Sequence, residues 1–304
     1  MMTAPLKQLS PAAYSRRVAA WSDNAASARR TALGVAFLAV RSLHIELSLH
    51  PKPGLVTPLD NGSHHDMDAA TFMRSLFTLR HYFKHICQAG MREAPFKQLK
   101  QLGIEAEARM LAATGGVNTH RGAIFSLGLL CAAAGCAHAR RLPPTPATLR
   151  ALLLANWGAE LACHSVSGAD SHGLRAAALH AASGAREEGA RGLPSVFEIG
   201  VPALQATLAR GGGAYHARID ALFTLMAHIS DTNVLHRGGA RGALLVRLHA
   251  RRFIDNGGTA HSHWQTTAQD CHRRFVRHRL SPGGAADLLA ASCLVLALSA
   301  HEPA

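Results

Sequence analysis

Acidic residues are scarce in this chain, and a few of them stand where a carboxylate could take part in chemistry. The 304 residues include 19 Asp and Glu against 32 Lys and Arg. Glu46 and Asp287 lie in apolar, helix-like stretches, and Asp66, Asp68 and Asp231 lie in polar turns beside such stretches. An ionised carboxylate near apolar surface is costly unless it is paired or bound to a metal. Carboxylate oxygens are also what Mg²⁺ takes as ligands, together with substrate phosphates and water.

Each of these acids has a purely structural alternative. Asp68 is placed to cap the helix that follows it, and Asp231 is placed to cap a turn. Glu46 could be no more than the partner of an arginine, and Asp287 lies in a first helical turn, where the helix dipole favours any acid. The pattern by itself leaves both interpretations open.

A second candidate is the segment 114–123, which reads Thr-Gly-Gly-Val-Asn-Thr-His-Arg-Gly-Ala and leads into an apolar helix. Unpaired amides at a helix start, glycines that allow close approach and the cation of Arg121 together predict an anion-binding cradle. The segment is not a Walker sequence. Its structural alternative is a Schellman-type stop at the glycines, followed by an Asn or Thr cap.

Other loops also combine glycine with basic residues, at 51–54, 184–194 and 233–239, and a Ser-Pro-Gly-Gly turn lies at 281–284. Several such loops favour a polyphosphate site over a nucleic-acid face, which more often shows aromatic platforms or a continuous basic stripe.

The histidines and cysteines point less clearly to a site. The 20 His are scattered, and the nearest to a metal cluster is His261 and His263 with Cys271 and His272, without a H-E-x-x-H motif. The six Cys form no C-x-x-C pair, which predicts small buried thiols in a reducing cytoplasm.

Helical patterns must position these loops. Apolar residues at helical spacing, ended by Gly or Pro, predict helices at 32–49, 69–88, 96–113, 120–137, 147–163, 202–209, 214–229, 240–254, 259–279 and 285–300. Strand signals are scarce. We therefore expect one all-α, multi-helix bundle domain of about ten helices over 31–304, with polar, Gly-rich loops forming the site. Residues 1–30 lack an apolar signal core and are expected to form a flexible arm.

Composition narrows the classes of protein. The 48% apolar content excludes a disordered chain, and the net charge of +13 favours an anionic partner. The longest apolar runs, at 123–137 and 288–300, fall short of the roughly 20 residues that a membrane span requires. We therefore expect no membrane partner.

Taken together, these loops resemble the triphosphoribosyl-dephospho-CoA synthases. The resemblance rests on Pro-Lys-Pro-Gly-Leu-Val at 51–56, Asn-Gly-Ser-His-His-Asp-Met-Asp at 61–68 and Thr-Gly-Gly-Val-Asn-Thr-His at 114–120. It continues in the same order with Asp-Thr-Asn at 231–233, Arg-Gly-Gly at 237–239 and Leu-Ser-Pro-Gly-Gly at 280–284. Arg121 stands where the family often has Lys, which keeps the charge. Thr57, where citrate lyase-type members tend to carry Asp, favours the malonate decarboxylase branch.

The resemblance implies an enzyme that joins ATP to the 2′-hydroxyl of 3′-dephospho-CoA and releases adenine. A separate holo-acyl-carrier-protein transferase would then attach the product to the carrier subunit of malonate decarboxylase or citrate lyase. The transition state should resemble an oxocarbenium ion, which calls for a nearby carboxylate and for a base to take the hydroxyl proton.

The same resemblance suggests roles for individual residues. Glu46, Asp66 and Asp287 are the candidates for the base, and Asp66, Asp68 and Asp231 share Mg²⁺ with the phosphates of ATP. The expected ATP and phosphate ligands are Lys52, Thr114, Gly115, Gly116, Asn118, Thr119, His120, Arg121, Asn233 and Arg237. Further expected site residues are His64, His172, Arg186, Glu188 and Ser281.

Two other functions fit the residues. One is an α-helical, Mg²⁺-dependent N-glycoside hydrolase of nucleotides, with the same carboxylates and water as the nucleophile. The other is a basic nucleic-acid-binding protein without catalysis, whose affinity would fall steeply with salt. The loop pattern favours the transferase, so we expect no nucleic-acid partner.

Overall fold

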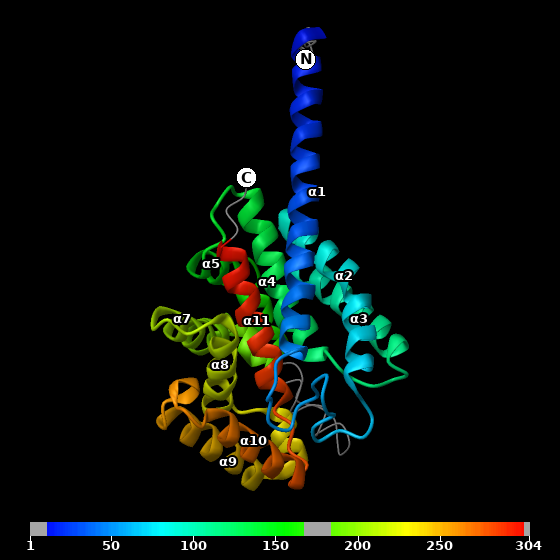
Figure 1. Ribbon diagram of the computed structural model, residues 1–304. Coiled ribbons are helices and arrows are strands. Elements are labelled where there is room, and N and C mark those ends of the chain that lie inside the picture. Colours follow the sequence, from blue (N-terminus) through cyan, green and yellow to red (C-terminus); the bar gives the residue numbers. More distant parts are fainter. Residues whose placement is uncertain (1–10, 167–183, 301–304) are drawn as a thin grey trace.

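Helices make up every regular element of the computed structural model, which describes residues 11–166 and 184–300 (Figure 1). No strand occurs in these two ranges, and the predicted all-α fold class is confirmed. The elements are α1 (Pro11–Leu47), α2 (Ala69–Met91), α3 (Phe96–Ala113), α4 (Arg121–Ala139), α5 (Pro146–Val166), the π-helix η1 (Ser195–Gly200), α7 (Val201–Ala209), α8 (Ala214–His228), α9 (Thr232–Asp255), the 3₁₀-helix η2 (Gly258–Ala260), α10 (Trp264–Arg277) and α11 (Gly283–Ala300). Residues 184–190 are helical as well.

Helix α2 shows how the sequence builds an element with one buried face. Leu76, Leu79, Phe83 and Ile86 recur every three or four residues and are buried, as the helical period requires. The helix begins after Asp68, whose Oδ1 accepts the backbone N–H of Thr71 at 2.8 Å. Asp68 is therefore an N-cap that satisfies one of the free amides of the first turn.

Helix α4 is apolar on all sides and lies in the centre of the bundle. It packs against α1, α2, α3, α5 and α11. Both α4 and α11 are long and apolar enough to cross a membrane. However, 78% of the most apolar 18-residue segment of α4 and 56% of that of α11 are buried inside the structure. Their apolar character is thus accounted for by packing within the protein.

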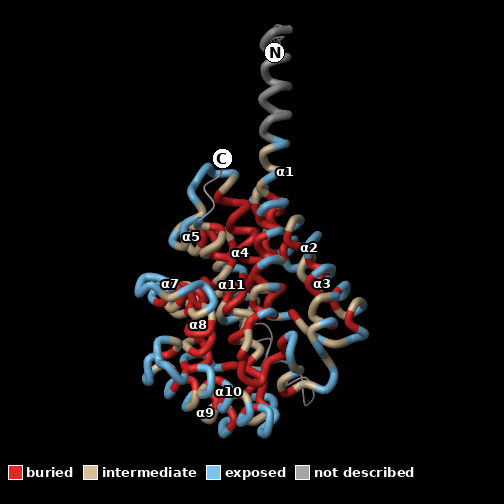
Figure 2. The backbone as a smooth tube through the Cα atoms, viewed as in Figure 1, coloured by how far each residue is buried: buried red, intermediate tan, exposed pale blue. Residues whose placement is uncertain are grey.

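Two apolar clusters form the core, and α11 belongs to both. The first cluster joins α1 to α5, and the second joins α7 to α10. Ala285 and Leu289 of α11 contribute to the second cluster, whereas Leu294 and Leu298 contribute to the first. Figure 2 shows the buried residues along the middle of the molecule, from α4 down to α9 and α10.

Three segments differ from the predicted elements. Helix α1 begins at Pro11, earlier than the predicted start at residue 32, because no Gly or Pro interrupts the Ala-rich stretch that follows. Helix α9 begins at Thr232, eight residues early, and bends at Gly239, whose φ of 58° only glycine adopts readily. Helix α10 begins at Trp264 because the 3₁₀ turn η2 occupies the residues before it.

The contact between α2 and α4 depends on glycines. A Cβ atom on Gly90 would overlap the carbonyl oxygen of Ala132, and one on Gly135 would overlap that of Cys87. Because these neighbours are backbone atoms, they have no rotamer with which to move aside. The close approach of the two helices is therefore set by the missing side chains.

We expect Gly90→Ala to lower the free energy of unfolding by about 1–3 kcal/mol, the usual cost of overpacking. Gly34→Ala is the matched control, since this exposed glycine of α1 has nothing within 4 Å of an added Cβ. That change should raise stability by roughly 0.5–1 kcal/mol through helix propensity alone. Urea denaturation measures both, and equal stabilities for the two variants would contradict the close α2–α4 contact.

Candidate active site

A large cavity, with a volume of about 1360 Å³, lies where the two apolar clusters meet. Its walls come from the end of α1, the α1–α2 loop, α2, α3, the start of α4, residues 184–195 and the starts of α9 and α11. The sequence-predicted residues that line it are Glu46, Lys52, His64, Asn118, Thr119, His120, Arg121, Arg186, Glu188, Asp231, Asn233, Arg237, Ser281 and Asp287. The fold thus brings together residues that lie more than 200 positions apart in the chain.

Asp231 caps two helices with one buried carboxylate. Its Oδ1 accepts the N–H groups of Asn233 at 2.9 Å and Val234 at 3.3 Å, at the start of α9. Its Oδ2 accepts the N–H of Ala285 at 3.0 Å, at the start of α11. A Cβ on Gly284 would lie only 3.0 Å from Oδ2, so the approach needs a glycine. Burial raises the pKa of Asp231, although the backbone amides act in the opposite direction.

Asp287 lies one turn further along α11 and faces the start of α4. Its carboxylate accepts the backbone N–H of Ala123, and a Cβ on Gly122 would overlap it. Burial, followed by the neighbouring charges of Glu46 and Asp231, raises the pKa of Asp287 well above its usual value. Three carboxyl groups therefore share this part of the cavity, and burial and the two neighbouring charges favour the protonated form of Asp287.

Glu46 is neutralised by a buried lysine. The Nζ of Lys52 lies 2.5 Å from Oε1 of Glu46, and both side chains are almost fully buried, with exposed fractions of 2% and 6%. The partner is thus a lysine, where an arginine was the alternative considered from the sequence. The pair lines the cavity wall and adds no net charge to it.

His120 is a neutral histidine in the cavity wall. Its Nδ1 lies 2.6 Å from the hydroxyl of Ser75, which in turn accepts a hydrogen bond from Thr119 at 2.8 Å. Burial, with a smaller contribution from Lys52, lowers the pKa of His120 to about 3. Sequence reasoning missed Ser75, although a serine on the buried face of an amphipathic helix is a recognisable signal.

The glycine segment divides into a structural half and a half that lines the cavity. Thr114 donates its hydroxyl to the carbonyl groups of Met110 and Val117, and Gly116 N–H donates to Leu111 O at 2.8 Å. Gly115 and Gly116 have φ values of 65° and 88°, so this half is a Schellman-type helix stop. Thr114, Gly115 and Gly116 do not line the cavity. The following residues, from Asn118 to Arg121, do.

Asn118 and Arg121 shape the rim at the start of α4. The Oδ1 of Asn118 accepts the N–H of Arg121 at 3.1 Å, as a capping side chain does. The Nε of Arg121 donates to Glu107 at 2.7 Å, and its guanidinium is about half exposed. Glu107, a second residue that the sequence did not single out, therefore orients this cation.

A second chain of hydrogen bonds links Arg237, His64 and Ser281. Arg237 donates to Ser63 O and to His64 Nδ1, each at 3.1 Å, and His64 Nε2 lies 2.8 Å from Ser281 Oγ. Because a guanidinium only donates, Nδ1 must accept, and Nε2 carries the proton that it donates to Ser281. Burial and the charge of Arg237 lower the pKa of His64, which agrees with a neutral ring.

Two other predicted residues lie in the segment 184–195, which also lines the cavity. The Oε1 of Glu188 accepts the N–H of Ser195 at 2.6 Å, and burial raises the pKa of Glu188. Arg186 lies in the same helical segment and, together with Arg191, adds positive charge to the lining. His172 lies outside the described residues.

The three acids expected to bind Mg²⁺ do not share one site. Asp68 and Asp231 use their carboxylates as helix caps, and Asp66 is 60% exposed, 3.6 Å from His64 and away from the cavity lining. Across residues 11–166 and 184–300, no group of three or more His, Cys, Asp or Glu is arranged to hold a metal ion. These residues therefore do not form a protein cage for a metal.

Comparisons with known proteins identify the family. Residues 32–304 match the family model CitG, described as ATP:dephospho-CoA triphosphoribosyl transferase. A protein of Acinetobacter calcoaceticus is 39% identical over 271 residues, 89% of this chain and 92% of that protein, and carries the name probable 2-(5″-triphosphoribosyl)-3′-dephosphocoenzyme-A synthase. A Pectobacterium atrosepticum protein named 2-(5″-triphosphoribosyl)-3′-dephosphocoenzyme-A synthase is 38% identical over 268 residues, 84% of this chain and 85% of its own. No solved structure matches the chain.

The raised pKa of Asp287 predicts a pH-dependent gain in stability for Asp287→Asn. Between the unfolded and the folded pKa of an acid whose pKa is raised on folding, the folded state binds the extra proton. The wild-type free energy of unfolding therefore falls as the pH rises through that interval, and the uncharged Asn removes this loss. We expect the stability of the variant relative to wild type to increase in urea denaturation as the pH rises above about 4, the ordinary pKa of an Asp carboxyl group. If the stability difference between Asp287→Asn and wild type shrinks as the pH rises, the pKa of the Asp287 carboxyl group is not raised by burial.

Proposed function

Because the chain belongs to the CitG family of ATP:dephospho-CoA triphosphoribosyl transferases, we propose that it transfers the 5-triphosphoribosyl group of ATP to the 2′-hydroxyl of 3′-dephospho-CoA. In this reaction the bond between C1′ of the ATP ribose and adenine breaks, and a bond from C1′ to the acceptor oxygen forms. The triphosphate stays intact. Adenine leaves with the electron pair of the broken bond and gains one proton, which balances the proton lost by the 2′-hydroxyl.

The observation that carries the proposal is the cluster of carboxylates in a cavity that also bears several cations. Asp231 and Asp287 place carboxylates in the cavity, where an oxocarbenium-like sugar would need negative charge, and Glu46 lies in the same wall as part of its ion pair with Lys52. The cations Arg121, Arg186, Arg191 and Arg237 line the same cavity. They suit the phosphates of two polyanionic substrates. A volume of about 1360 Å³ leaves room for both.

We assign the proton transfer from the attacking 2′-hydroxyl to Asp287. Glu46 is already held by Lys52 at 2.5 Å, and Asp66 does not line the cavity. The raised pKa of Asp287 makes it the stronger base among the carboxylates, which favours proton abstraction. The backbone N–H of Ala123 holds the carboxylate in place for this step.

We propose that the triphosphate lies against the start of α4 and Arg237, with Mg²⁺ entering as part of the substrate MgATP. Asn118, Thr119, His120 and Arg121 line this wall. Mg²⁺ keeps most of its ligands from phosphates and water when only one or two carboxylates are available. Of the three acids first considered as ligands, only Asp231 lines the cavity, so the phosphates would supply most of the coordination.

The product is proposed to serve malonate decarboxylase in preference to citrate lyase, after attachment to a carrier subunit by a separate transferase in the cytoplasm. The support for this branch is Thr57, whose hydroxyl accepts the N–H groups of Leu59 and Asp60 at 3.2 Å. Cys87, Cys131, Cys136 and Cys271 are buried thiols, as a reducing compartment allows.

Incubation with ATP, Mg²⁺ and 3′-dephospho-CoA tests the reaction directly. We expect adenine release that requires dephospho-CoA, together with an adduct of the matching mass. Chromatography and mass spectrometry measure both products. Adenine released without the acceptor would indicate the hydrolase, in which water replaces the 2′-hydroxyl. A folded protein that releases no adenine but binds nucleic acid in a salt-dependent way would overturn the enzymatic proposal.

Three isosteric variants separate the candidate bases. Asp287→Asn should lower kcat at least about 100-fold, the usual contribution of a general base. Asp66→Asn should change kcat by less than about threefold, since this carboxylate is not in the cavity lining. Glu46→Gln removes one partner of a buried ion pair and should lower thermal stability as well as activity. If Asp66→Asn shows the large loss and Asp287→Asn does not, the assignment of the base is wrong.

A further inference from the structure

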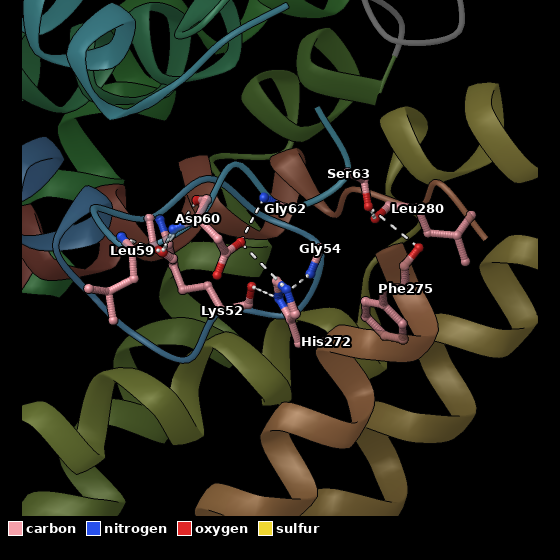
Figure 3. A network of polar contacts seen from close by, with 10 residues as sticks. Lys52, Gly54, Leu59, Asp60, Gly62, Ser63, His272, Phe275 and Leu280 are labelled. Carbon is pink, nitrogen blue, oxygen red and sulfur yellow. Dashed lines mark hydrogen bonds and ion pairs between the residues drawn. The ribbon is translucent and has the colours of Figure 1, made fainter. Parts of the chain in front are cut away.

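The backbone on both sides of Lys52 is held by a histidine from α10, more than 200 residues further along the chain. Figure 3 shows the imidazole of His272 against the α1–α2 loop. Its Nδ1 lies 3.3 Å from the carbonyl oxygen of Lys52 and 3.4 Å from the backbone nitrogen of Gly54. Its Nε2 lies 3.5 Å from Oδ1 of Asp60. One ring therefore joins α10 to the loop residue that carries the buried ammonium and to a carboxylate of the same loop.

Asp60 is itself fixed by the loop that it helps to fold. Its Oδ1 accepts the N–H of Gly62 at 2.7 Å, and its carbonyl oxygen accepts the N–H of Thr57 at 2.8 Å. Figure 3 shows this carboxylate directed toward both Gly62 and His272. A carboxylate next to one ring nitrogen of a histidine sets the orientation of the ring.

The loop is held at several points, and at Lys52 the carbonyl oxygen accepts the N–H of Leu55 at 3.2 Å. Gly54 has a φ of 70° and lies so close to the carbonyl of Leu280 that a Cβ would overlap it. The hydroxyl of Ser63 donates to the same carbonyl at 2.6 Å. These contacts fix Gly54 and Ser63 on the α10–α11 connection. With Nε2–H directed to Asp60, the neutral ring of His272 accepts the N–H of Gly54 at Nδ1, beside the carbonyl of Lys52.

We propose that His272, oriented by Asp60, is a positioning residue that fixes the backbone of Lys52 and thereby holds its ammonium beside Glu46 in the cavity. Its effect on catalysis rests on the proposed function, together with the expectation from the sequence that Lys52, which lines the cavity, contacts the phosphates of ATP. The triphosphate is unchanged by the reaction, so a contact to it is equally strong in the ground state and the transition state. Loss of such a contact raises KM for ATP and leaves kcat nearly unchanged.

Two substitutions at His272 separate its two nitrogen atoms. The amide of Asn occupies the position of Nδ1 and keeps a polar contact to the backbone of Lys52, whereas the amide of Gln occupies that of Nε2. We expect His272→Gln to raise KM for ATP about tenfold, the size of one lost hydrogen bond in a buried setting, with kcat changed less than threefold. His272→Asn should stay within about threefold of wild type in both constants. His278→Asn, an exposed histidine at the end of the same helix, is the matched control.

The role of Asp60 is tested by a double-mutant cycle. Asp60→Asn should raise KM for ATP in the wild-type background and add little in the His272→Gln background, because the carboxylate acts through the ring. Equal effects in both backgrounds would overturn the coupling. Equal losses for His272→Asn and His272→Gln, with a matching fall in melting temperature, would show that the histidine only packs the loop and would overturn the positioning role.

Direct binding keeps this inference separate from the proposed function. Calorimetric titration with MgATP measures the Kd of each variant without the acceptor. If the wild type binds MgATP but forms no adduct with dephospho-CoA, the proposed reaction fails while the order of the Kd values still tests His272. If the wild type forms the adduct and His272→Gln binds MgATP as tightly as wild type, the positioning role is wrong and the proposed reaction stands.

Discussion

The double cap made by Asp231 is the interaction on which the rest of the site depends. One buried carboxylate accepts amides from the starts of both α9 and α11, so the two helices must begin at the same point in space. This junction therefore sets the positions of Arg237 in α9 and of Asp287 in α11, both of which line the cavity. A hydrogen-bonded acid at two helix starts is favoured by both dipoles, which offsets part of the cost of burying its charge. Without it, the two starts would carry unpaired amides in a buried setting.

The site carries more negative charge than burial alone would tolerate. Asp287 interacts with both Glu46 and Asp231, and Lys52 neutralises only Glu46. The remaining repulsion and desolvation appear as a raised pKa on Asp287. A carboxyl group of this kind weakens the folded state near neutral pH, and the same property makes it a stronger proton acceptor. In the proposed reaction, the positive charge that develops on the sugar would offset the electrostatic repulsion between these carboxyl groups.

The α1–α2 loop shows how distant segments complete the site. Its conformation is held by the α10–α11 connection through Gly54 and Ser63, and by α10 itself through His272. The same connection carries Ser281, which closes the hydrogen-bond chain from Arg237 through His64. The two apolar clusters are therefore joined by polar contacts around the cavity as well as by the shared helix α11. Relative movement of the clusters would disturb Lys52 and Asp287 together.

The sequence by itself determined the helices and the family, because both depend on short-range information. Apolar spacing, Asp68 as a cap and the glycine stop at Gly115 act within about four residues, and the polar loops keep their family pattern along the chain. The bend at Gly239 and the early start of α9 were missed, since a glycine pair reads as a loop in isolation.

The tertiary structure alone decided which of the candidate acids and cations face one cavity. Asp66, Asp68 and Asp231 look alike in sequence, yet one is exposed, one caps α2 and one joins two helices beneath the cavity. Likewise, nothing near Lys52 in the sequence indicates that a histidine on α10 holds its backbone.

Burial and charge pairing are set by contacts between residues far apart in the chain. The pKa of Asp287 is therefore raised only once those contacts have formed.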